Sequence, residues 1–206
     1  MNQITIDDLH EMVDALSAAL DAKNSYMCGH SERVAELSLM LAKHMGLSAA
    51  EQTRIHIGAH LHDIGKIGIP DAILNKQGKL TADEFAIIRQ HPEIGDTIVG
   101  KLKVFHSVAD IVRHHHERMD GKGYPDGLCG QEISLGARIV AVADAFDAMT
   151  SARPYRSALT VSQAIDETRR CQGTQFDPDI VAVLVNMSSK IKLLDNKTKA
   201  GLVAIA

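Results

Sequence analysis

Hydrophobic residues recur every three or four positions along most of the chain, which is the period of amphipathic helices rather than of strands. The first such stretch covers about residues 7–23. A second follows His30 and stops at Gly46, a residue type that is common at helix C-termini. A third opens at Ser48, which has Glu51 three positions later, the spacing of a capping box. The pattern therefore predicts three successive helices early in the chain.

Further helix starts are marked by pairs of residues that typically begin helices. These pairs are Thr81 with Glu84, His91 with Pro92, Thr160 with Gln163, and Asp177 with Pro178. Two more helices are expected over about residues 104–116 and 134–151, and the glycine-rich stretch 120–130 between them is expected to be a loop. Aromatic residues make up only 3% of the chain, which disfavours a strand-rich fold. We therefore expect an all-α protein.

The composition indicates one main domain without a membrane span. The chain has 206 residues, 45% of them hydrophobic, which is enough for one substantial core. Apolar runs such as residues 139–142 are far shorter than the roughly 20 residues of a membrane-spanning helix. The N-terminus carries acidic residues where a secretory signal would be basic, and Cys28, Cys129 and Cys171 have no paired spacing. We expect a cytoplasmic protein.

The charge of the chain argues against one class of ligand and leaves another open. A net charge of −4 disfavours binding of duplex nucleic acid, which usually requires a basic face. An anionic substrate would have to be attracted by local positive charge. Eleven histidines are many for this length, and several stand beside carboxylates. Surface histidines are common, so a role is expected for only some of them.

Two acidic positions favour metal binding. His62 and Asp63 are adjacent where a helix ends, and there the imidazole can bind one ion while the carboxylate bridges two. Asp144 lies in the apolar stretch AVADAFDAMT, where an unpaired buried charge would cost several kcal/mol. A metal ligand and a structural ion-pair partner both explain Asp144.

The run His114–His115–His116 is internal, so it is not a tag, and it is followed directly by Glu117 and the glycine-rich loop. Any single histidine has a structural alternative, but polar candidates at the ends of several helices favour a metal cluster. The candidate ligands are His30, His62, Asp63, His91, His115, His116 and Asp144. Imidazoles with carboxylates suit Fe, Mn, Zn or Ni rather than Ca or Mg.

Metal ions in such a cluster lower the pKa of a bound water and neutralise charge on phosphate oxygens, so we expect phosphodiester hydrolysis. Asp63 and Lys66 are the candidate catalytic residues. Lys66 would add a cation beside the phosphate or protonate the leaving oxygen. The alternative for Lys66 is a solvated surface lysine.

Several motifs together resemble the HD-GYP domains. They are HDIGK from His62, HHERMDGKGYP from His115, HSERV from His30, His91-Pro92, Ala137-Arg138 leading to VADAFDAMTSARPYR, and QFDP from Gln175. The resemblance covers about residues 20–185. It implies an all-helical fold with a five-helix metal-binding core and additional GYP-region and C-terminal helices. It also implies hydrolysis of the bacterial messenger cyclic di-GMP to linear pGpG, and it leaves open whether pGpG is cleaved further to GMP.

The resemblance also implies roles for individual residues. His30, His62, Asp63 and Asp144 match the basic ligand set, and His91, His115 and His116 complete a second site bridged by Asp63. Lys66 matches a substrate-contacting lysine, and Arg153 and Arg156 match residues that grip the phosphates and guanines of the dinucleotide. Tyr26 stands where some members have a glutamate that binds a third ion. We therefore expect two divalent metal ions, Fe or Mn, with Zn or Ni as alternatives.

The GYP segment leaves two interpretations open. Tyr124 offers a stacking face for substrate, while the family's loop is also associated with contacts to diguanylate-cyclase domains. The simpler alternative is a rigid turn in which Glu117 and Asp120 make local hydrogen bonds.

The expected domain organisation is an N-terminal helix over residues 1–23, packed on an HD-GYP catalytic domain over residues 24–206. The chain is either a stand-alone enzyme or an excised domain, and its apolar C-terminal stretch 191–206 serves either core packing or a homodimer. Competing functions are hydrolysis of cyclic GMP-AMP and a signalling module that binds a cyclic dinucleotide or a cyclase domain without turnover.

Overall fold

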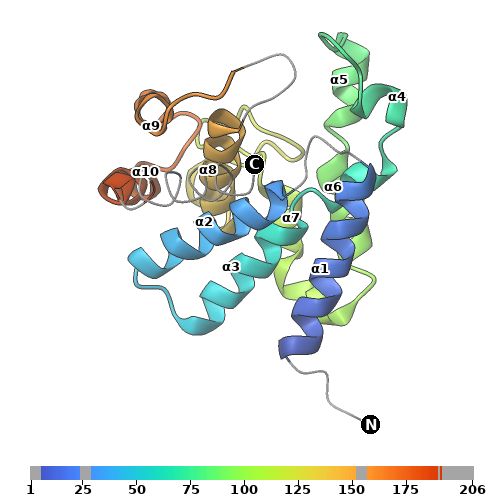
Figure 1. Ribbon diagram of the computed structural model, residues 1–206, viewed down its shortest axis with the longest axis horizontal. Helices are drawn as coiled ribbons and strands as arrows, with labels where there is room; N and C mark the ends of the chain where they lie inside the picture. The colour runs from blue at the N-terminus through green and yellow to red at the C-terminus, as the bar shows by residue number, and fades with distance from the viewer. Residues whose placement is uncertain (1–5, 24–28, 152–156, 190, 192–206) are drawn as a thin grey trace, which may run out of the picture.

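The computed structural model describes residues 6–23, 29–151, 157–189 and 191, and this part of the chain is built from helices (Figure 1). Within it there are no extended strands, only two isolated bridges, Asp120 with Cys129 and Gln172 with Phe176. The expected all-α class is confirmed. The α-helices are α1 (Ile6–Lys23), α2 (His30–His44), α3 (Ala49–Leu61), α4 (Asp71–Leu74), α5 (Ala82–Ile88), α6 (His91–Val99), α7 (Ala109–His114), α8 (Leu135–Thr150), α9 (Val161–Arg170) and α10 (Pro178–Asn186). Short 3-10 helices are η2 (Ile64–Gly68), η3 (Lys103–Val108) and η4 (Gly130–Glu132).

Three helices begin directly after the cap residues that the sequence predicted. Thr81 and Thr160 form complete capping boxes with Glu84 and Gln163. Ser48 accepts a hydrogen bond from the backbone N–H of Glu51, but the Glu51 carboxylate pairs with Arg54, so only half of that capping box forms.

The helix expected over residues 104–116 is wrong in two respects. Its first part is the 3-10 helix η3, and α7 ends at His114, so that His115 and His116 lie beyond the helix. Neighbouring residues inside a helix point about 100° apart, whereas the ring centroids of these two imidazoles lie 4.1 Å apart. Because α7 ends at His114, two residues before the expected end, both rings can lie on the same side.

Two apolar clusters form the core. The larger one joins α2, α3, α8, α9 and α10 and includes the fully buried residues Leu41, Ile55, Ile139 and Leu184. The smaller one lies among α1, α3, α7 and the 3-10 helices, around Leu61, Phe105 and Val112. Helix α8 packs against α2, α3 and α7, while α6 packs against α7 and η2. The remaining pair, α4 and α5, stands out from the body at the upper right of Figure 1.

The Ala137-Arg138 motif and the QFDP motif from Gln175 have a structural role, because they supply the two residues of one ion pair. The guanidinium of Arg138 on α8 pairs with the carboxylate of Asp177, which in turn caps α10 by accepting the N–H of Asp179. This buried pair fastens the C-terminal helices to α8. No helix in the described part of the chain is both long enough and apolar enough to cross a bilayer.

Helix α1 packs against α3 and η2, with Val13 fully buried. Lys23 adds a hydrogen bond of 2.6 Å from its Nζ to the carbonyl oxygen of Ile67. The helix thus contacts the segment that follows Asp63, while the domain boundary near residue 24 stays a prediction.

Replacing Leu20 of α1, which is 2% exposed, with alanine is expected to lower the free energy of unfolding by about 2–4 kcal/mol, because a large buried side chain is lost. Urea unfolding measures the change. The exposed neighbour Ala19, replaced with serine, is the control and should change the free energy by no more than about 0.5 kcal/mol. Equal small effects for both variants would contradict the packing of α1.

Candidate metal centre

The turn after α3 positions the predicted His62–Asp63 pair. His62 is the C-cap of α3, and Asp63 directly precedes η2. Gly65 in η2 lies so close to α6 that a Cβ atom there would come within 1.8 Å of the carbonyl oxygen of His91. Only glycine permits this approach, which places Asp63 beside the first residue of α6.

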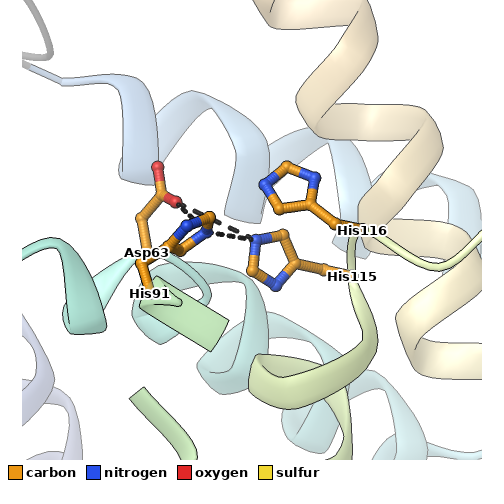
Figure 2. Close-up of side chains that lie close together, drawn as sticks. All are labelled: Asp63, His91, His115 and His116. Carbon is orange, nitrogen blue, oxygen red and sulfur yellow. Dashed lines mark hydrogen bonds and ion pairs between the residues drawn. The ribbon is translucent and has the colours of Figure 1, made fainter. Parts of the chain in front are cut away.

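The structure brings all seven sequence-predicted ligands together, in two groups. One group is Asp63, His91, His115 and His116, and the other is His30, His62 and Asp144. Within each group, one ligand atom of every residue lies within 4.8 Å of the others. Figure 2 shows the first group, in which Asp63 and His91 face His115 and His116. The ligands come from the ends of α2, α3, α6 and α7 and from the middle of α8.

The carboxylate of Asp63 lies between the two groups. Its Oδ1 atom is 3.3 Å from Nε2 of His91 and 3.9 Å from Nε2 of His115. Its Oδ2 atom is 3.3 Å from Nε2 of His62 and 3.8 Å from Nε2 of His30. One oxygen therefore faces each group, which is the arrangement that a bridging carboxylate needs.

The local backbone determines which ring nitrogen each histidine offers. Three Nδ1 atoms donate to carbonyl oxygens three residues earlier: His62 to Ala59 at 2.6 Å, His91 to Ile88 at 2.8 Å, and His115 to Val112 at 2.8 Å. Each Nε2 atom is then left with a lone pair that points into the cluster. This is the tautomer that a metal ion requires.

Buried polar atoms without partners show that the residues fit cations. The Nε2 atoms of His91 and His115 are 3.2 Å apart, and with both Nδ1 atoms protonated neither can donate to the other. The Nε2 atom of His62 and the Oδ1 atom of Asp63 are buried without a hydrogen-bond partner. Buried polar atoms are rarely left unsatisfied in folded proteins. Positive ions among these lone pairs would satisfy them.

The protonation states of His115, His116 and Asp63 also suit metal binding. Burial lowers the pKa of His116 to about 3 and holds the pKa of His115 well below its usual value, so both rings are neutral. Burial raises the pKa of Asp63, but nearby Lys66 and His62 outweigh this and hold it well below its usual range. For His30, burial by itself lowers the pKa of the imidazole. Hydrogen bonds to Asp144 and Asp147 outweigh this and raise the pKa to about 9. In the absence of a cation, His30 is thus the positive group between these carboxylates.

A family model described as an HD domain matches residues 14–180. The chain belongs to the HD-domain family. It is 41% identical over 184 residues to the cyclic di-GMP phosphodiesterase response regulator RpfG of Xanthomonas campestris pv. campestris, across 88% of this chain and 49% of that relative. It is 40% identical over 183 residues to the 3'3'-cGAMP-specific phosphodiesterase 3 of Vibrio cholerae, across 88% of this chain and 40% of that relative. The HD domain thus spans about half the length of these curated relatives, or less.

Among solved structures, this HD domain is similar to Bd1817, a HDG"Y"P protein from Bdellovibrio bacteriovorus, with a TM-score of 0.67 and 21% identity. The match covers 90% of this chain and 65% of that chain. It shows the fold, and the expected HD-domain architecture is confirmed. The family match and the relatives also confirm the resemblance to HD-GYP domains. Membership of this family implies divalent metal binding, and the cluster fits it.

The sequence analysis missed Asp147, which contacts the HD domain's first ligand from one turn beyond Asp144. Its Oδ2 atom is 2.7 Å from Nδ1 of His30, and its Oδ1 atom accepts a hydrogen bond of 2.6 Å from Nε of Arg33. A carboxylate that accepts from the outer nitrogen of a ligand histidine holds the ring orientation. The spacing of three residues between Asp144 and Asp147, matched by His30 and Arg33, was the signal available in the sequence.

Replacing Asp147 with alanine is expected to weaken metal binding at His30, His62 and Asp144 by about 10- to 100-fold, because the ring of His30 loses its acceptor. Competition with a chelator measures the affinity. An Asp147→Asn variant keeps an oxygen acceptor and should lose less, and Asp110→Ala, on the surface beside Arg54, is the control. Wild-type affinity for both ions in the alanine variant would contradict the role.

The structure places Lys66 and Tyr124 at the cluster. Nζ of Lys66 is 2.5 Å from Oδ2 of Asp63, so Lys66 is not a solvated surface lysine. The ring of Tyr124 lies 4.9 Å from that of His116. His114 instead faces Asp126 on the outside, at 2.9 Å. The predicted substrate contacts Arg153 and Arg156, and also Tyr26, lie outside the described residues.

The loop that contains Gly123-Tyr124-Pro125, here called the GYP loop, folds back on the end of α7. Oε1 of the buried Glu117 accepts the backbone N–H groups of Asp126 and Gly127 at 2.7 and 2.9 Å. A Cβ atom at Gly123 would come within 2.5 Å of the Cα of Glu117, so the loop needs glycine there. Glu117 thus makes the local hydrogen bonds that the simpler alternative named, while Tyr124 lies beside His116 of the cluster, so both interpretations of the segment stay open.

A cavity of about 360 Å³ opens beside the cluster under this loop. Its lining includes the ligands His115, His116 and Asp144. Three cationic residues that the sequence analysis did not single out, Arg89, Arg118 and Lys122, line it as well. A ligand in this cavity would lie next to the candidate metal ligands and beside positive charge.

Proposed function

We propose that this HD domain is a metal-dependent phosphodiesterase that hydrolyses cyclic di-GMP to linear pGpG. The observation that carries the proposal is the position of Asp63 between two groups of metal ligands that border a cation-lined cavity. The names of curated relatives support the substrate class. Because the chain spans only part of those relatives, their activity comes to this chain as a proposal.

The donor set supports two divalent ions. Asp63 would be shared, with His91, His115 and His116 holding one ion and His30, His62 and Asp144 the other. Mixed imidazole and carboxylate ligands suit Fe or Mn, with Zn or Ni as alternatives. When bound, such ions supply Lewis acidity toward phosphate oxygens and an activated water.

The remaining residues would bind the substrate and handle its charge. Lys66 contacts Asp63, so its ammonium group is in position to stabilise a phosphate at the cluster or to protonate the leaving oxygen. Arg89 and Lys122 line the cavity, and their positive charge would help a chain with a net charge of −4 to attract an anion. The ring of Tyr124 lies at the same place, 4.9 Å from that of His116.

The test is hydrolysis by protein purified and loaded anaerobically with Fe or Mn. Chromatography should show conversion of cyclic di-GMP to pGpG, and elemental analysis should give about two ions per chain. Full metal occupancy with bound but intact dinucleotide would contradict the proposal and favour a signalling module without turnover.

Cyclic GMP-AMP is the second candidate substrate, because a relative that is 40% identical is named as specific for it. Side-by-side hydrolysis of the two dinucleotides decides between them. Contacts of the GYP loop with diguanylate-cyclase domains, a homodimer and a cytoplasmic location stay predictions.

A further inference from the structure

Phe85 is an exposed aromatic side chain with no structural reason to be hydrophobic. Helix α5, which carries it, has no buried residue, and Phe85 is 48% exposed. The helix is stabilised by its capping box and by an ion pair of 2.6 Å between Lys76 and Glu84, neither of which involves Phe85. Of the large exposed hydrophobic residues in the described ranges, which also include Ile67 and Leu102, Phe85 alone lines the cavity beside the metal centre.

Arg89 is one helical turn after Phe85 and lines the same cavity. Side chains four residues apart lie on one face of a helix. The guanidinium carbon of Arg89 lies 4.6 Å from the ring centroid of Tyr124, a cation–π contact. The contact joins α5 to the GYP loop, so three residues from two separate segments face a common space.

The hydrogen-bond donors of Arg89 are available to a ligand. Every other arginine in the described part of the chain pairs with a carboxylate: Arg33, Arg54, Arg113, Arg118, Arg138, Arg169 and Arg170. Arg89 makes no ion pair or side-chain hydrogen bond with any described residue, and its guanidinium carbon lies over the ring of Tyr124. An arginine whose N–H donors are unpaired is suited to planar bidentate recognition.

We propose that Phe85, Arg89 and Tyr124 form a guanine-binding subsite for one half of the cyclic dinucleotide. A purine presents a face that stacks on aromatic rings. Guanine also offers the O6 and N7 acceptors side by side, and the arginine fork donates to both, whereas adenine has a donor in place of O6. The cavity of about 360 Å³ is at the low end of the usual range for ligand sites, so it is assigned to one nucleotide half.

The subsite rests on the proposed function, because it assumes a guanine-containing phosphodiester at the metal centre. It goes further by predicting that Arg89 determines preference for guanine over adenine. Since His115 and His116 line the same cavity, a base held there would keep its attached phosphate near the cluster.

The experiment measures kcat/KM of the metal-loaded protein for cyclic di-GMP, cyclic di-AMP and bis(4-nitrophenyl) phosphate, a diester without a base. In Arg89→Gln, the ratio of kcat/KM for cyclic di-GMP to that for cyclic di-AMP should fall about 10-fold or more. In Phe85→Ala, kcat/KM for both dinucleotides should fall about 5-fold or more relative to the baseless diester. Arg169→Gln, on the exposed surface of α9, is the control and should match the wild type.

Equal losses for all three substrates in Arg89→Gln would overturn the proposal, because Arg89 would then act on the fold or the metal centre. If the loaded wild type binds cyclic di-GMP without cleaving it, the proposed function fails. The subsite is then tested separately, by measuring dissociation constants of the two dinucleotides by calorimetry. An unchanged ratio of those constants for cyclic di-GMP and cyclic di-AMP in Arg89→Gln overturns it, and a ratio about 10-fold smaller supports it.

Discussion

Replacing Asp63 with asparagine is expected to remove both metal ions and to lower phosphodiester hydrolysis by about 10³-fold or more. Each oxygen of Asp63 faces one group of histidines, at 3.3 Å from His91 on one side and from His62 on the other. Asparagine has nearly the same shape, but it is neutral and presents an N–H donor to one of the two groups. The shared ligand is lost while the packing is kept.

Elemental analysis and turnover are the two measurements for this variant. They should fall together, and the free energy of unfolding of the metal-free protein shows whether the fold is intact. Asp83→Asn, on an exposed position of α5, is the matched control and should retain metal and activity. An Asp63→Asn variant with two ions and wild-type turnover would refute the bridging role.

Replacing Gly65 with alanine is expected to destabilise the protein by about 3 kcal/mol or more. The added Cβ would meet backbone atoms of α6, namely the carbonyl oxygen of His91 at 1.8 Å and the nitrogen of Gly95 at 2.5 Å. Backbone atoms in a helix cannot move aside as a side-chain tip can. Helix α6 would have to shift, and His91 would move away from Asp63.

The midpoint of thermal unfolding should accordingly fall by about 6–12 °C in Gly65→Ala. Gly68 belongs to the same 3-10 helix, but a Cβ there meets only the side chain of Ile94, at 3.0 Å. Gly68→Ala is therefore the control and should cost about 1 kcal/mol or less. A similar midpoint for both variants would show that η2 does not approach α6 this closely.

The candidate ligands were accessible from the sequence because their chemistry is local and unusual. A histidine next to an aspartate at a helix end, and an aspartate inside an apolar helix, both indicate a role from residue type and position alone. The end of α7 was misjudged by two residues, since the preference of His115 and His116 for helix or turn is weak. Their packing opposite His91 decides it.

Asp147 and Arg89 could not be assigned before the fold was known. Asp147 contacts His30 across 117 residues of sequence, and Arg89 contacts Tyr124 from a different segment. Residue spacing can show which side chains share a helix face, but it does not predict either contact, because each depends on how two separate helices or loops are placed.

The sequence by itself determined the all-helical class, the caps at Thr81, Thr160 and Asp177, and the residue types of the metal centre. Helical periodicity and capping act over three or four residues, so they can be read along the chain. Only the tertiary structure showed which oxygen of Asp63 faces which group of ligands, and that Arg89 keeps its donors unpaired beside a cavity. Both depend on long-range packing, including the close contact of Gly65 with α6, which the order of residues alone does not specify.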